Sequence, residues 1–262
     1  MNIFRFGSLC LLAGSLVAAT GCTEKTRPMD SSKAQTTPPS HPTYKVDGAT
    51  AGSVSGAVHT GGKRPSREFV DMSGDPACVA AHHGKATDES VLVGSNGAVA
   101  NAFVYIEKGL EGKTFDVPQA PVIIDQRGCW FRPRVLGIQT AQVLQIVNSD
   151  PVTHNIHPMA RVNREWNHSQ GPGDAPLIRK FLKPEVMVQV KCNIHSWMHA
   201  FIGVVDHPYF AVTKEDGSFE IKNLPPGTYT LSVWHEKLGT SQRQVEVTPG
   251  NRSVTRFELE RK

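Results

Sequence analysis

Residues Val186–Met198 read Val-Met-Val-Gln-Val-Lys-Cys-Asn-Ile-His-Ser-Trp-Met and combine a strand pattern with a cluster of metal-binding side chains. The even-numbered positions from 186 to 192 are Val, Val, Val and Cys. Alternate side chains of a strand point to the same face, so we expect Cys192 to emerge on the buried face. A thiolate in an apolar interior is costly unless a partner such as a metal ion compensates its charge.

The strand runs into a Cys-x2-His-x2-Met motif formed by Cys192, His195 and Met198. Thiolate, imidazole and thioether are soft ligands that suit copper. Electron-transfer copper sites use two His and one Cys, with a weakly bound axial Met. The second His must come from elsewhere in the chain, and His154 is the candidate. The motif therefore predicts one copper ion and single-electron transfer.

The segment His154-Asn155-Ile156 and Cys192 lie 38 residues apart, counted from His154. Together they resemble the ligand segments of the cupredoxins, the small blue copper proteins. The short ligand loop is similar to that of the amicyanin and pseudoazurin type. The resemblance covers residues 116–207 and implies a Greek-key β-sandwich. It also implies one type 1 copper, with Met198 as the axial ligand and with three equatorial ligands, His154, Cys192 and His195.

The same resemblance implies further roles. Asn155 is expected to tie the two ligand loops together by hydrogen bonds, as outer partners of metal ligands do. His195 is expected to reach the surface and pass the electron to a redox protein such as a cytochrome. An apolar collar for docking would come from Trp197, Ala200 and Phe201, although Trp197 could equally pack over the site. No position is left open for a substrate, so we expect an electron carrier rather than an enzyme.

The rest of the folded chain is predicted to be all-β. Short alternating apolar runs are separated by Gly, Pro, Asn and Asp turns, and one short helix is expected over 76–83. Residues 52–58 read Gly-Ser-Val-Ser-Gly-Ala-Val, and Asp216-Gly217 and Pro226-Gly227 mark two tight turns. These features resemble the carboxypeptidase-regulatory-like, or transthyretin-like, β-sandwich module. The predicted fold class is a Greek-key cupredoxin sandwich plus this smaller sandwich.

The order of the two sandwiches leaves two arrangements open. In the first, a copper domain at 116–207 is inserted into a sandwich built from an N-terminal β region at 51–115 and a C-terminal part at 208–262. In the second, residues 51–207 form one enlarged copper domain that is followed by the module. The pairing partners of the strand at 54–58 distinguish the two arrangements.

The first 50 residues predict export and tethering. An apolar run follows Arg5, and Ala19-Thr20-Gly21-Cys22 resembles a bacterial lipoprotein cleavage site, so residues 1–21 are expected to be a signal peptide. Acylated Cys22 would then anchor the protein to a membrane at the periplasm or cell surface. The Thr-, Ser- and Pro-rich residues 22–50 are expected to be a flexible linker. The net charge of +4 is modest and dispersed, so we expect no nucleic-acid partner.

Cysteine counting fits a copper thiolate. If Cys10 leaves with the signal and Cys22 takes lipid, three cysteines remain in an oxidising compartment. A disulfide between Cys78 and Cys129 would leave Cys192 free as a ligand. The alternative pairs Cys192 with one of the other two.

Two rival functions and one rival site stay open. A copper-delivery protein would hold copper(I) on an exposed loop without a redox role. A structural or carbohydrate-binding surface lipoprotein would use the regulatory-like module and carry only a vestigial copper fold. A second, softer copper site could be formed by His157, Met159 and His199, although surface residues on the ligand loops are the favoured interpretation.

Overall fold

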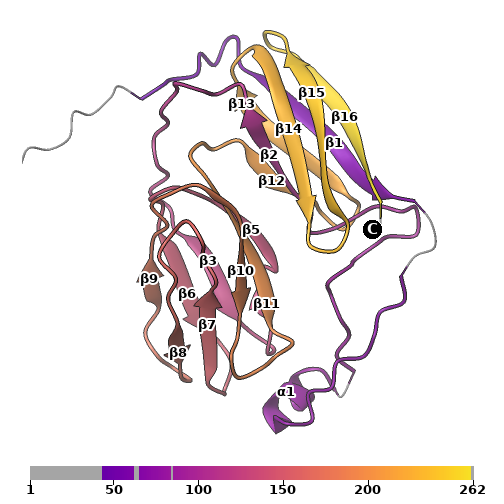
Figure 1. The fold of residues 1–262 in the computed structure, drawn as a ribbon, viewed down its shortest axis with the longest axis vertical. Coiled ribbons are helices and arrows are strands. Elements are labelled where there is room, and N and C mark those ends of the chain that lie inside the picture. Colours follow the sequence, from indigo (N-terminus) through magenta and orange to yellow (C-terminus); the bar gives the residue numbers. More distant parts are fainter. Residues whose placement is uncertain (1–42, 62–64, 84, 261–262) are drawn as a thin grey trace, which may run out of the picture. The chain divides into compact units, whose positions relative to one another are not determined.

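The computed structural model describes residues 43–61, 65–83 and 85–260, and these are nearly all β-structure (Figure 1). The all-β prediction is confirmed, and the one helix of the described residues, α1 (Pro76–Ala81), lies within the predicted span. The predicted signal peptide, Cys22 and most of the predicted linker lie outside the described residues. Among the helical segments that the structure describes, none is long and apolar enough to cross a bilayer.

One β-sandwich, here called the central sandwich, is formed by strands between residues 122 and 205. Its larger sheet has the order β5-β11-β10-β7-β8 and its smaller sheet the order β4-β3-β6-β9. The strands of the larger sheet are β5 (Val135–Gln139), β7 (His154–Pro158), β8 (His168–Gln170), β10 (Glu185–Lys191) and β11 (His199–Val205). Those of the smaller sheet are β3 (Val122–Gln126), β4 (Phe131–Arg132), β6 (Leu144–Asn148) and β9 (Leu177–Arg179).

The second sandwich, here called the flanking sandwich, combines strands from both ends of the described chain. A three-stranded sheet has the order β13-β1-β16, and a four-stranded sheet the order β12-β2-β14-β15. The first contains β1 (Gly52–Thr60), β13 (Ser218–Leu224) and β16 (Arg252–Leu259). The second contains β2 (Phe103–Lys108), β12 (Phe210–Val212), β14 (Gly227–His235) and β15 (Gly239–Val247).

The strand pairing shows how the chain is organised. β1 runs parallel to β16 and antiparallel to β13, while β2 is antiparallel to β12 and β14. The strands that precede the central sandwich therefore complete a sheet pair with the strands that follow it. The strand at 54–58 pairs with C-terminal strands, as an insertion requires.

The contacts between the sandwiches include an apolar cluster and a buried ion pair. Phe103 of the flanking sandwich shares a small core cluster with Val135 and Val205 of the central sandwich. A Cβ added to Gly203 would lie 2.4 Å from the Phe103 ring, so only glycine allows this approach. Arg134 binds Glu236 through two hydrogen bonds of 2.5 and 2.9 Å. Both side chains are buried, which makes the pairing geometry essential because an unpaired charge would be costly there.

Candidate metal centre

Cys192 follows β10 and faces the core of the central sandwich. Val188, Val190 and Cys192 are all buried, as the alternation predicts, but Val186 is 38% exposed. The pairing of β10 with β11 shifts register between Glu185 and Val188, so the regular alternation begins only after this irregularity. The prediction of a buried Cys192 is therefore correct, while the extension of the pattern to Val186 is wrong.

The loop from Cys192 to Met198 is held by its own hydrogen bonds. The Cys192 amide donates to the Met198 carbonyl at 3.1 Å, and the Met198 amide donates to the His195 carbonyl at 3.0 Å. The His195 amide donates to Cys192 Sγ at 3.4 Å. Met198 is completely buried in the same core cluster as Cys192. These hydrogen bonds fix the position of the Cys192 sulfur without a bound metal.

His154 begins β7 and brings the second imidazole to the loop. Its Nδ1 lies 3.0 Å from Nδ1 of His195, and the latter atom lies 3.9 Å from Cys192 Sγ. One ligand atom from each of these three residues lies within 4.8 Å of the others, and all three side chains are buried. The structure thus brings together the three predicted equatorial ligands.

The outer nitrogens of both imidazoles are bound by carboxylates. His154 Nε2 lies 2.7 Å from Asp150 Oδ2, and His195 Nε2 lies 3.2 Å from Asp75 Oδ2. An Nε2–H that donates to a carboxylate leaves the Nδ1 lone pair for a metal and fixes the ring orientation. Both Nδ1 atoms therefore face each other, which is the arrangement of a metal site.

Asn155 connects the two ligand segments. Its Oδ1 accepts a hydrogen bond of 3.0 Å from the Asn193 amide, directly after Cys192. Its side-chain amide donates to the carbonyl of His168 in β8 at 3.2 Å. This buried side chain spans the gap between β7 and the ligand loop.

The charged forms of His154 and Cys192 favour each other. Burial disfavours the charged form of His154, but the Asp150 carboxylate and the Cys192 thiolate outweigh burial and raise the pKa of His154 to about 9. Burial also opposes ionisation of Cys192, yet the hydrogen bonds from His154 and the loop amides lower its pKa. For His195, burial lowers the pKa, and Asp75 opposes this effect. The lowered pKa of Cys192 favours the thiolate, the form that binds metal.

The donor set fits copper. Two imidazole nitrogens and one sulfur lie close together in the buried interior, and a completely buried thioether residue, Met198, follows His195 by three residues. This combination matches the soft, mixed nitrogen and sulfur ligands that copper prefers. Two further groups with metal-like geometry, among the described residues, contain Cys78 or Cys129. Those two sulfurs are bonded to each other in a disulfide and carry no thiolate, so neither group offers a comparable site.

The expectation that His195 reaches the surface is wrong. His195 is only 4% exposed, because the segment around α1 covers it. The N-cap residue Asp75 binds the first amides of α1 through Oδ1 and His195 through Oδ2. Cys78, within α1, is joined to Cys129, and its sulfur lies 3.9 Å from His195 Nε2. The disulfide-linked helix α1 thus covers His195, at the edge of the site that the cupredoxin resemblance predicts to be open.

The prediction of an apolar collar for docking near His195 is also wrong. Ala200 is completely buried, and the Phe201 ring packs 4.9 Å from Trp234 of the flanking sandwich. Trp197 packs against His195 at a ring distance of 5.1 Å and donates its indole N–H to the Cys129 carbonyl. Trp197 therefore packs over the site, which was the alternative interpretation.

Of the residues in the rival second site, His157 has other partners. His157 bonds to Glu165 and Asn193, and neither it nor His199 belongs to a candidate metal group among the described residues. The sequence reasoning missed Asp75 and Asp150. Asp150 lies four residues before His154, a spacing that could have drawn attention to it. Asp75 is 120 residues from His195, and no local pattern connects them.

A comparison with family models agrees with the resemblance to the regulatory-like module. A family model for the carboxypeptidase regulatory-like domain matches residues 200–260. This span covers most of β11 and the five strands from β12 to β16, hence the C-terminal part of the flanking sandwich. No curated protein gives a significant match.

Solved structures similar to this chain include cupredoxins. A purple cupredoxin from Nitrosopumilus maritimus is 21% identical over 33% of this chain and 99% of its own length, with a TM-score of 0.28. Amicyanin from Paracoccus versutus is 16% identical over 38% of this chain and 96% of its own, with a TM-score of 0.29. A copper-containing nitrite reductase from Thermus scotoductus SA-01 is 22% identical over 38% of this chain, with a TM-score of 0.32, and the match spans only 25% of that enzyme. Each of these structural similarities covers less than half of the chain, and the match to the regulatory-like domain covers residues 200–260.

Proposed function

We propose that the chain is a single-electron carrier with one type 1 copper bound by His154, Cys192 and His195, and axially by Met198. The observation that carries the proposal is the buried meeting point of three donors, with both imidazoles oriented by carboxylates. A copper ion bound there would supply a Cu(II)/Cu(I) couple. Four protein ligands would fill the site, so we propose no enzymatic reaction.

The chain's own residues suit electron transfer in two ways. The loop hydrogen bonds and Asn155 fix the donors, so little movement would accompany a change of oxidation state. The burial of His154, Cys192 and His195 would exclude water from a bound ion. A copper-delivery protein needs ready exchange of its ion, and burial under a disulfide-linked helix opposes exchange.

The proposed location is outside the cytoplasm, with a lipid on Cys22 as the membrane anchor. The proposal is supported by the apolar segment that precedes Cys22 and by the disulfide between Cys78 and Cys129. Disulfides persist in oxidising compartments and are rare in the cytosol. The proposed partner is a redox protein such as a cytochrome.

The test is the visible spectrum of the full chain, purified in detergent, loaded with copper and oxidised. An intense thiolate-to-copper band is expected, and it should disappear in Cys192→Ser and change in His154→Gln. The matched control His157→Gln replaces a histidine outside the three donors and should retain the band. A colourless protein that binds copper(I) would instead indicate copper delivery, and a protein that binds no copper would overturn the proposal.

A further inference from the structure

We propose that the groove between residues 162–166 and 179–183 is the docking surface for an acidic patch on a protein redox partner. His157 and Asn193 would connect this surface to Cys192. The inference rests on the proposed electron-carrier function and adds the place and the charge of the partner. Four features of the groove carry it: its fixed walls, its unpaired cations, its apolar rim and its connection to the ligand loop.

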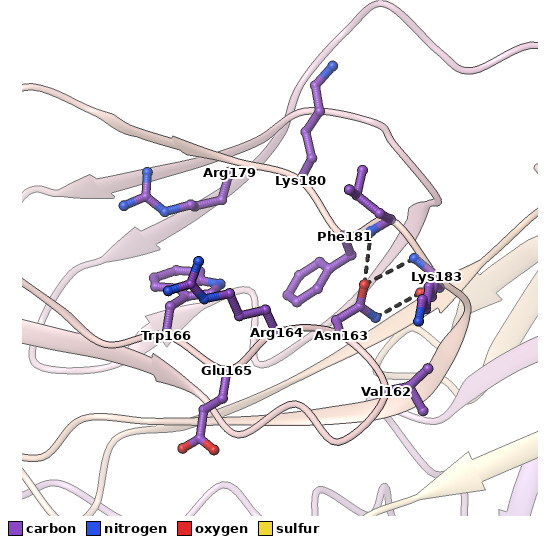
Figure 2. Close-up of a pocket in the computed structure, with 10 residues that line it drawn as sticks. Val162, Asn163, Arg164, Glu165, Trp166, Arg179, Lys180, Phe181 and Lys183 are labelled. Carbon is purple, nitrogen blue, oxygen red and sulfur yellow. Dashed lines mark hydrogen bonds between the residues drawn. The ribbon is translucent and has the colours of Figure 1, made fainter. Parts of the chain in front are cut away.

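The groove has fixed walls and a volume of about 630 Å³ (Figure 2). Asn163 joins the two segments, because its side chain donates to the Lys183 carbonyl and accepts from the amides of Leu182 and Lys183. The carboxylate of Glu185 binds the amides of Arg161 and Asn163. The shape is therefore present before a partner arrives, which lowers the ordering cost of binding.

The lining is strongly cationic. Its four cations are Arg164, Arg179, Lys180 and Lys183, and none of them forms an ion pair with another described residue. The one carboxylate of the lining, Glu165, is bound to His157 at 2.5 Å, and Figure 2 shows it directed away from the lysines. Such an uncompensated patch attracts an acidic surface and accelerates its association at low ionic strength.

Apolar and aromatic groups accompany the charge. The rim carries Val162 and Leu182, which are 53% and 70% exposed. Trp166 is half-buried, and the Arg179 guanidinium lies 5.3 Å from the centre of its ring. Protein interfaces are enriched in Trp and Arg that anchor a partially apolar patch. The combination favours a protein partner over a small anion, for which charge alone would suffice.

A short connection leads from the groove to the thiolate. Glu165, in the groove wall, bonds to His157 Nε2 at 2.5 Å, and His157 Nδ1 lies 3.3 Å from Asn193 Oδ1. Asn193 follows Cys192 in the chain, and its amide bonds to Asn155. The His195 edge, in contrast, is closed by α1 and Asp75. We infer that one electron passes from the reduced haem iron of the partner to Cu(II), giving Fe(III) and Cu(I), through the side where His157 lies.

Docking can be tested without copper. The probe is hexacyanochromate(III), a redox-inert paramagnetic trianion, titrated into the metal-free full chain while amide NMR signals are followed. Signals of 162–166 and 179–183 should broaden, and the broadening should vanish in Lys180→Glu/Lys183→Glu, which changes two exposed side chains. The control Lys214→Glu/Arg243→Glu makes the same charge change at exposed positions of the flanking sandwich and should preserve the broadening.

The protein partner is tested with two forms of one reductant. Reduced mitochondrial cytochrome c is basic, and the same protein with its lysines succinylated is acidic. The acidic form should reduce the copper-loaded chain faster, and the Lys180→Glu/Lys183→Glu variant should lose roughly tenfold or more of that rate at low ionic strength. The control variant should lose less than twofold. His157→Leu should slow the electron-transfer step without changing hexacyanochromate binding.

The outcomes separate the two proposals. If no blue centre forms, the proposed function fails, while the anion titration still tests the groove. Equal rates with both cytochrome forms, or equal rates in the two charge-reversal variants, would overturn the docking proposal. It would also be overturned if the groove variant abolished sedimentation with phosphatidylglycerol vesicles but left the reaction with the acidic cytochrome unchanged, because the groove would then face anionic lipid.

Discussion

The two sandwiches bury histidines in opposite ways. In the flanking sandwich, His207 lies 2.8 Å from the backbone carbonyl of Ile106 through Nε2, and burial lowers its pKa. Burial also lowers the pKa of His235 to about 4. In the central sandwich, Asp150 and Cys192 raise the pKa of the equally buried His154 to about 9. Burial alone favours the neutral form of a histidine, whereas ionised partners nearby favour its charged form.

The core clusters show the same contrast. The flanking core consists of apolar and aromatic residues. The central core adds Cys192, Met198 and the Cys78–Cys129 disulfide to a comparable apolar set. The flanking sandwich should therefore act as a structural frame and the central sandwich as the metal-binding part, and substitutions should separate stability from copper binding.

Phe257→Ala should give the largest change in stability. Phe257 is completely buried in the flanking core, and truncation of a buried aromatic ring costs about 3–5 kcal/mol. The blue band of the copper-loaded protein should be unchanged, because no ligand lies in this cluster. Chemical denaturation and the visible spectrum measure the two effects, and Val254→Ala, at a position that is 78% exposed, is the control. Loss of the band at unchanged stability would contradict the division of roles.

Removal of the disulfide should destabilise the central sandwich next most. Cys78 and Cys129 are 51 residues apart, and closing a loop of this length contributes roughly 2–4 kcal/mol. Thermal unfolding of Cys78→Ser/Cys129→Ser should show this loss. The variant should still bind copper at low temperature, since neither sulfur is a proposed ligand. A variant of unchanged stability that no longer bound copper would show that the pair serves the metal directly.

Copper affinity should depend on pH in a defined direction. The folded-state pKa of His154 is about 9, above its ordinary value of 6.5, so this group stabilises the metal-free fold below pH 6.5. That contribution declines as pH rises and is lost through pH 9. Copper must displace the proton, so its affinity should rise roughly tenfold per pH unit from about pH 7 to 9. Competition with a chelator of known pH behaviour measures this slope, and a flat profile would refute the ion pair.

Asp75→Asn should produce a smaller change, at the covered edge of the site. Asp75 accepts a hydrogen bond from His195, and removal of its negative charge should disfavour Cu(II). The reduction potential should rise by roughly 50 mV, equivalent to about 1 kcal/mol, as determined by redox titration. Asp71→Asn removes a carboxylate that binds Ser73 and should leave the potential unchanged. If both variants had the same reduction potential, Asp75 would have no influence on the bound copper.

The sequence predicted the local parts of this structure. The short strands, the helix at α1 and the burial of Cys192 follow from alternation and turn residues, which act between near neighbours. The closure of the His195 edge could not be predicted, because Asp75 and Cys78 lie outside residues 116–207, the segment whose sequence resembles the cupredoxins. The exposure of Val186 likewise depends on a register shift against β11, which only the paired strand determines.

X-ray absorption at the copper edge tests the central claim most directly, because it detects the atoms bound to the ion. In the copper-loaded full chain, we predict one short copper–sulfur contact and two copper–nitrogen contacts from imidazole, nearly unchanged between the oxidised and reduced forms. A first shell of nitrogen and oxygen without sulfur, or a large change of ligand distances on reduction, would contradict a type 1 electron-transfer centre at Cys192.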